Sequence, residues 1–324
     1  MLKQSWNGQQ YAIDGYRAVD PNFVKSLRSH NPALVIRKTI YLWLQLIAGW
    51  LLLLFAKPVF WLPAFVILVA SQQSMVTWVH EASHFSLFRS KRLNDIWCNI
   101  FFGAPIGMNV ESYRTSHMTH HNHLSTEQDR DGWAQAVDWT GFGLIREILL
   151  AATGYYGFRI LFSKYASVLR APRTGQAKND GQSLLFVCAA FVWNGGLFTA
   201  AFLCGHWYCY ILFWLYPVFS IAQLINMVRT SAEHQPQGFP SVPLSAHPIV
   251  RTTIPSIVEK WLIYGINFNY HLEHHLWPFV PFFNLPSLHS HLRERGFYQL
   301  HPELVQGSAF ARVWGLSRPN ATHT

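Results

Sequence analysis

Three clusters of histidines are the residues whose types and spacing point most directly to chemistry. Positions four apart on a helix lie on one face, about 6 Å from each other, so such clusters can present several imidazoles to one metal centre. The first cluster follows an uncharged run that begins at Val59, and it contains His80 and His84 in the segment HEASH. The other two share the pattern HxxHH and contain His117, His120 and His121, and His271, His274 and His275.

Eight imidazoles are more than one metal ion needs. A tetrahedral zinc takes four ligands, whereas two metals with four or five nitrogen ligands each would use the whole set and keep a position open. Zinc, copper, nickel and iron all accept imidazole, so the ligand type alone does not name the metal. The clusters therefore predict a dinuclear metal site, and with it an enzyme.

The composition indicates that this site lies at a membrane. Half of the 324 residues are hydrophobic and 13% are charged, roughly half the charged share of soluble proteins. The formal net charge of +9 comes from scattered Lys and Arg residues, not from a basic tract, so nucleic acid is not expected as a partner. The cysteines lack the spacing of metal ligands or of a disulfide framework and are interpreted as packing residues: Cys98, Cys188, Cys204 and Cys209.

Four segments are long and apolar enough to cross a bilayer, namely residues 40–56, 59–79, 184–204 and 208–228. Very short connections within the first pair and within the second pair predict two helical hairpins. The expected fold is one all-α integral membrane domain over residues 1–324. In it, residues 1–39, 80–180 and 229–324 form a helical cap that carries the histidine clusters.

The distribution of positive charge predicts the orientation. Of the 25 Lys and Arg residues, 24 fall in the three parts outside the spans and only Lys57 falls on the opposite side. The positive-inside rule therefore places both termini and all three histidine clusters in the cytoplasm. Within residues 80–180, Ile96–Met108 and Phe142–Phe162 are apolar but interrupted by glycine, proline or charge. This pattern favours helices that lie in the membrane interface.

Taken together, the clusters resemble one enzyme family. HEASH after the second span, HMTHH about thirty residues later, two further spans, and then NYHLEHHLWP with FFNLPSLH are similar to the membrane fatty acid desaturase and hydroxylase superfamily. The resemblance covers about residues 40–295 and implies a diiron centre that activates dioxygen. It also implies a ninth ligand after the fourth span, where this sequence has His234. Thr230 stands where some acyl-CoA desaturases carry an Asn that reaches one iron through water.

The resemblance implies a membrane oxidoreductase that desaturates a long-chain fatty acid or acyl lipid entering from the bilayer. Hydroxylation or ketolation of an alkyl, acyl or carotenoid chain stays open, because sequence does not show the geometry at the iron. The reaction needs two external electrons, and the chain lacks a cysteine cluster, a dinucleotide-binding motif and a haem module. A ferredoxin or cytochrome with its reductase is therefore expected as partner, in a bacterial inner membrane.

Two rival interpretations use parts of the same pattern. HEASH also fits the His-Glu-x-x-His motif of zinc proteases, here of the intramembrane kind, with Glu81 as general base, but a protease leaves the other two clusters unexplained. A metal transporter would carry polar ligands near the middle of its spans, and these spans are almost free of ionisable groups.

The remaining polar residues have less defined roles. Four carboxylates are candidates to accept N–H groups of the ligands, namely Glu81, Glu111, Glu233 and Glu273. His123, two residues after the second cluster, is a candidate ligand or proton shuttle. The other histidines stand alone and are expected to be structural: His30, His206, His247, His289, His291, His301 and His323.

Overall fold

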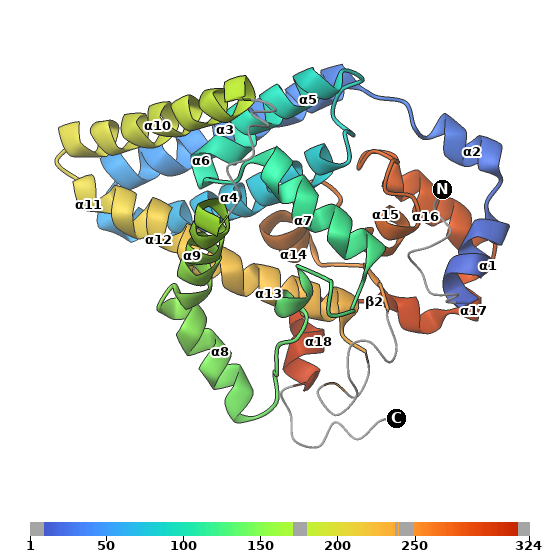
Figure 1. Cartoon of the computed structure of the whole chain (residues 1–324). Coiled ribbons are helices and arrows are strands. Elements are labelled where there is room, and N and C mark those ends of the chain that lie inside the picture. Colours follow the sequence, from blue (N-terminus) through green and yellow to red (C-terminus); the bar gives the residue numbers. More distant parts are fainter. Residues whose placement is uncertain (1–9, 171–179, 237–238, 240–248, 317–324) are drawn as a thin grey trace.

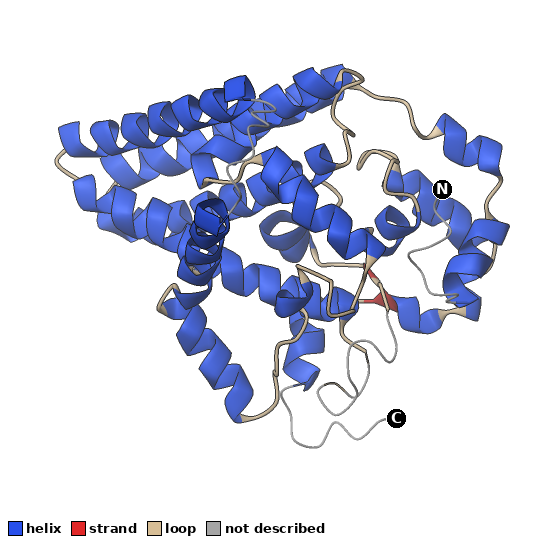
Figure 2. Ribbon diagram, viewed as in Figure 1, coloured by secondary structure: helices blue, strands red, loops and turns tan. Residues whose placement is uncertain are grey.

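The computed structural model describes residues 10–170, 180–236, 239 and 249–316. This part of the chain is mostly helical, as expected (Figure 2). The sequence did not predict one feature, a parallel pair of two-residue strands, β1 (Thr252–Thr253) and β2 (Val305–Gln306). This pair joins the segment that follows the fourth span to the C-terminal part of the chain.

The α-helices are α1 (Gln10–Ala18), α2 (Pro21–Ser26), α3 (Pro32–Phe55), α4 (Trp61–Ser83), α5 (Lys91–Cys98), α6 (Ala104–Ile106), α7 (Val110–Asn122), α8 (Phe142–Ala152), α9 (Tyr155–Arg170), α10 (Asp180–Leu203), α11 (Trp207–Tyr210), α12 (Tyr216–Phe219), α13 (Ile221–His234), α14 (Ile257–Glu259), α15 (His271–Leu276), α16 (Leu285–Glu294), α17 (Phe297–Leu300) and α18 (Ala309–Leu316). Three π-helical segments extend them: Asn99–Gly103, Ile211–Leu215 and Lys260–Tyr264. Short 3-10 turns lie at Pro58–Phe60, Gly132–Ala134 and Pro302–Leu304.

Four helical stretches are long and apolar enough to cross a membrane: Pro32–Phe55, Pro58–Ser83, Leu184–Leu203 and Trp207–His234. They match the four expected spans, with different ends. α3 begins earlier than expected because Asn31 caps it and accepts the N–H of Leu34, with a proline in the first turn. The second stretch runs on to Ser83 and the fourth to His234. Both spans therefore carry histidines of the site in their last turns.

The four stretches pack as one bundle. α3 lies against α4 and α10 lies against α11, and Figure 1 shows these four helices on one side of the molecule, with α1, α2, α15, α16 and α17 on the other. Trp78 and Trp214 are fully buried in the core between them. On the outside, Leu44 and Phe191 are 61% and 76% exposed, as expected for a surface that faces lipid.

The shorter helices form two further cores beside this bundle. One joins the N-terminal arm to the C-terminal part, because α1 contacts α15 and α17. The other lies among α4, α8, α13 and α18. Among the apolar stretches expected in the interface, α8 and α9 do carry exposed apolar side chains, such as Phe142 and Phe162. Ile96–Met108 differs, because it buries Cys98 and Phe102 in the bundle core.

The orientation of the bundle in the membrane is a testable prediction. Reporter fusions after residues 57, 110, 206 and 300 are expected to read outside, inside, outside and inside, because 24 of the 25 Lys and Arg residues lie in the parts assigned to the cytoplasm. Activity of a periplasmic reporter and a cytoplasmic reporter at each point checks this. A periplasmic signal at residue 110 would contradict both the topology and the cytoplasmic position of the histidines.

Candidate metal centre

All nine histidines predicted as ligands lie together, in two adjacent groups. The five-histidine group contains His80, His84, His117, His121 and His274. The four-histidine group contains His120, His234, His271 and His275. Within each group the nitrogens that can bind a metal lie within 4.8 Å of one another. The rings of His121 and His275 stack across the boundary with centroids 4.2 Å apart, so the two groups form one centre.

Four helices position these side chains. α4 ends at Ser83, so His80 lies in its last turn and His84 caps it. α13 ends at His234. α7 and α15 lie between the two groups, and each supplies both of them. His117 and His121, one turn apart on α7, face the five-histidine group, whereas His120 faces the other.

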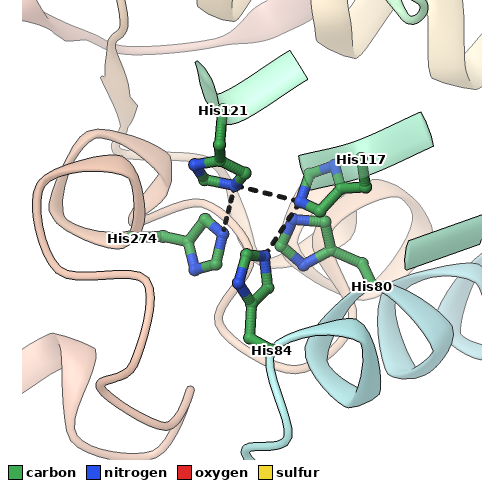
Figure 3. A group of neighbouring side chains, drawn as sticks. All are labelled: His80, His84, His117, His121 and His274. Atoms are coloured by element: carbon green, nitrogen blue, oxygen red, sulfur yellow. Dashed lines mark hydrogen bonds between the residues drawn. The ribbon is translucent and has the colours of Figure 1, made fainter. Parts of the chain in front are cut away.

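The spacing of the nitrogens fits a bound metal. Nε2 of His117 lies 2.9 Å from Nε2 of His84 and 3.0 Å from Nε2 of His121 (Figure 3). In the other group, Nε2 of His271 lies 2.9 Å from Nε2 of His234 and 3.1 Å from Nε2 of His275. Neighbouring ligands at about 2.1 Å from one ion would be about 3 Å apart. Several lone pairs therefore converge on each of two points.

Burial favours the neutral form of an imidazole, which is the form that binds metal. Seven of the nine are 1–3% exposed: His80, His117, His120, His234, His271, His274 and His275. Burial, together with the positive charge of Arg114, lowers the pKa of His84 to about 3. Burial and the neighbouring imidazoles hold the pKa values of His121 and His275 well below the ordinary value.

A carboxylate that the sequence did not indicate holds His120. Nδ1 of His120 donates to Asp129 at 3.0 Å, which leaves Nε2 for the four-histidine group. Burial alone would raise the pKa of Asp129, but this bond and the backbone N–H groups of Ser125 and Asp131 lower it below its ordinary value. Gln135 also donates to Asp129 at 3.1 Å. Sequence offers one signal for this role, the acidic segment just after the second cluster.

The four carboxylates named from the sequence have different surroundings. Oε1 of Glu81 lies 3.5 Å from Nδ1 of His80, and Oε2 of Glu233 lies 3.5 Å from Nε2 of His271, so both lie beside ligands. Glu111 accepts from Asn99 instead, and Glu273 binds partners outside the third cluster. Among the described residues, none of the four accepts a hydrogen bond from a ligand imidazole, although Glu81 and Glu233 lie beside one.

The charges around the centre also fit metal ions. Four carboxylates near the centre are buried, namely Glu81, Asp129, Glu233 and Glu273. Of these four, only Glu233 pairs with a Lys or Arg of the described residues, namely Arg229 at 2.6 Å. A buried ionised carboxylate without a cation is costly. Neutral imidazole ligands add no charge of their own, so two divalent ions bound there would supply positive charge beside these carboxylates. Both ring nitrogens of buried His80 lack a hydrogen-bond partner among the described residues, which fits a ligand as well.

Other residues considered from the sequence lie outside the two groups. His123 caps the C-terminus of α7 and is exposed. Thr230 donates to the carbonyl of Asn226 in its own helix at 2.6 Å. His206 contacts the hydroxyl of Tyr208 at 3.0 Å. His30, His289, His291 and His301 are also outside both groups. His247 and His323 lie outside the described residues.

The described part of the chain thus combines four possible membrane spans with nine clustered histidines that could hold metal ions. The fatty acid desaturase family matches residues 56–305, most of the chain, and the chain belongs to this family. Dihydrorhizobitoxine desaturase of Bradyrhizobium elkanii is similar, with 27% identity over 241 residues. That alignment covers 69% of this chain and 66% of the relative's own length. The resemblance to desaturases is confirmed as membership of this family, and the described part of the chain has four helices long and apolar enough to cross a membrane.

Acid is expected to destabilise the metal-free protein. The unfolded chain takes up protons on histidine near pH 6.5, but His84 in the folded chain does so only near pH 3. Below pH 6.5 the free energy of unfolding should therefore fall by about 1.4 kcal/mol per pH unit for each such histidine. Thermal unfolding of the chelated protein in detergent at pH 7.5, 6.5 and 5.5 measures this. Equal stability at pH 7.5 and 5.5 would contradict neutral, buried imidazoles.

Proposed function

We propose that this protein uses dioxygen, two iron ions and two external electrons to desaturate a long-chain acyl substrate, either a fatty acid or an acyl lipid. The observation that carries the proposal is the division of nine histidines into groups of five and four around two neighbouring points. Membership of the desaturase family supports iron over the other metals that imidazole accepts.

The chain's own residues would hold the two ions and fix their surroundings. His80, His84, His117, His121 and His274 would bind one ion, and His120, His234, His271 and His275 the other. When bound, such a diiron pair supplies the activation of dioxygen and the removal of hydrogen from an unactivated C–H bond. Asp129 orients His120, and the buried carboxylates balance positive charge.

An apolar cavity supports a hydrocarbon substrate. It has a volume of about 690 Å³, and its wall includes Phe65 and Val69 of α4, Val228 of α13 and Trp314 of α18. Val69 precedes His80 by eleven residues, which is about three helical turns, so both lie on one face of α4. A chain held there would run along the side of α4 that carries the metal ligands, away from water.

The surroundings of Glu81 favour this function over a zinc protease. A protease of the His-Glu-x-x-His kind needs this carboxylate as a general base for water. Here Glu81 is buried and accepts the hydroxyl of Ser86 at 3.1 Å and the backbone N–H of Phe282 at 3.2 Å. The group beside it also includes histidines of α7 and α15. A protease leaves those ligands without a role.

Lipid mass spectrometry tests the proposal. The protein would be expressed in a host that lacks the gene, and the lipids would be compared with those of a host carrying His274→Ala. Loss of two hydrogens from an acyl chain is the expected result. Gain of one oxygen would identify a hydroxylase of the same family. Because the relative is named for a different substrate, dihydrorhizobitoxine should be supplied in parallel; its conversion without any acyl product would overturn the acyl substrate.

A further inference from the structure

Glu273 lies in the middle of the third histidine cluster, but its carboxylate binds partners from three other elements. Oε1 accepts Nδ1–H of His289 of α16 at 2.5 Å and also accepts the hydroxyl of Tyr298 of α17. Oε2 accepts the hydroxyl of Thr252 of β1. Glu273 and Thr252 are fully buried, and the other two are at least nine-tenths buried. These four residues form one closed network, which we call the Glu273 network.

This network fixes the rotation of a short helix that is otherwise held by apolar packing, with Leu272 and Leu276 buried in the core that includes α1. α15 contains six residues, and within the described structure the residue before it, Tyr270, makes no capping bond through its side chain. Helices this short are unstable by themselves, because few backbone bonds offset the cost of ordering. The orientation of α15 must therefore come from side-chain contacts.

The network lies on the side of α15 opposite the metal ligands. Each residue advances the helix by about 100° around its axis. His274 therefore lies about 60° from His271 in one direction, and His275 lies about 40° from it in the other. Glu273 lies about 160° from His271, on the far side of the helix. Rotation of α15 about its axis would move all three histidines at once. Since His274 belongs to one group and His271 and His275 to the other, such a rotation would disturb both metal sites.

We propose that Glu273 is the positioning residue of the third cluster, and that His289, Tyr298 and Thr252 hold it so that α15 presents its three histidines to both metals. The inference rests on the metal site of the proposed function. It also changes the role expected for His289. This histidine is not in either metal group, yet its loss should weaken metal binding through Glu273.

Replacement of each donor tests the role. Tyr298→Phe, Thr252→Val and His289→Ala each remove one donor, whereas His289→Asn keeps an N–H group near the position of Nδ1. His291→Ala is the matched control, because His291 lies on the same helix and stacks on Phe23 with ring centroids 4.3 Å apart. Purified protein would be loaded with ⁵⁷Fe(II), and two measurements made: the rate of iron loss to a chelator and the Mössbauer spectrum.

Iron should leave Tyr298→Phe and His289→Ala about ten times faster than the parent, as for loss of other residues that orient ligands. The Mössbauer parameters of both irons should change, and His289→Asn should restore most of the parental behaviour. A purely structural role predicts less folded protein with an unchanged spectrum. Parental loss rates and spectra in folded Tyr298→Phe and His289→Ala would overturn the inference alone. A parent that binds no iron would overturn the proposed function, and this inference with it.

Discussion

Replacing His120 or His274 with alanine is expected to abolish desaturation and to lower bound iron from about two ions per chain to one or fewer. His120 belongs to the four-histidine group and His274 to the five-histidine group, so the two variants test both sites. Each substitution leaves a coordination position that no remaining neutral ligand can fill. The loss of activity should exceed the 10–100-fold that removal of a residue orienting a ligand costs. Iron per folded chain and product per unit of membrane protein are the measurements.

Two histidines outside both groups, His206 and His123, serve as controls. His206→Ala should keep the parental iron content, because His206 lies in the turn between α10 and α11 and belongs to neither histidine group. In His123→Ala, lost activity with retained iron would assign His123 to proton delivery, and lost iron would make it a ligand. Each variant needs a check of its abundance, so that misfolding is not counted as ligand loss. Parental activity in His120→Ala or His274→Ala would contradict the two-metal centre, and loss confined to His80, Glu81 and His84 would favour the zinc protease.

Sequence predicted the parts of this molecule that depend on local pattern. Uncharged runs locate the spans because hydrophobic length is the main requirement for crossing a bilayer. Spacing of four residues predicted that His80 and His84 share a helix face, and both lie in the five-histidine group. The family resemblance supplied His234, for which the chain offers no local repeat. α13 ends at this residue and brings it to the centre.

Sequence could not predict how the histidines divide between the two groups. The division depends on how α7 and α15 are placed between the two groups, and that is set by contacts between segments far apart in the chain. Asp129 was missed for a similar reason, because a loop must reverse direction to bring it back to His120. Glu273 shows the opposite error. It stands between ligands in the sequence, but the orientation of a six-residue helix turns it away from them.

The N-terminal arm shows the same limit. The positive-charge pattern predicted only that residues 1–39 belong to the cytoplasmic cap, and nothing in it indicates a docking site. In the structure, Tyr16 donates to the carbonyl of Leu276 at 3.2 Å, and His30 contacts the carbonyl of Phe85, next to His84. The arm therefore holds the segments that follow the first and third histidine clusters. Such contacts join residues up to 260 positions apart, which no local pattern encodes.

The isolated protein is expected to be inactive with NADPH alone and to turn over only when a ferredoxin or cytochrome and its reductase are added. Formation of an alkene and water from dioxygen consumes two electrons that the substrate does not supply. The sequence contains no cysteine cluster, dinucleotide-binding glycine motif or haem module that would accept them from NADPH. Product formation should therefore rise from background to steady turnover on addition of the donor pair.

Ionic strength and a chemical reductant make this experiment specific. The formal net charge of +9 favours an acidic donor, so the rate at limiting donor should fall as salt rises from about 0.05 to 0.5 M. Dithionite followed by dioxygen should give at most one round of product without any protein donor, which separates a faulty metal centre from a missing electron source. Steady turnover by the isolated chain with NADPH would overturn the dependence, because it would require an internal electron path that the sequence does not contain.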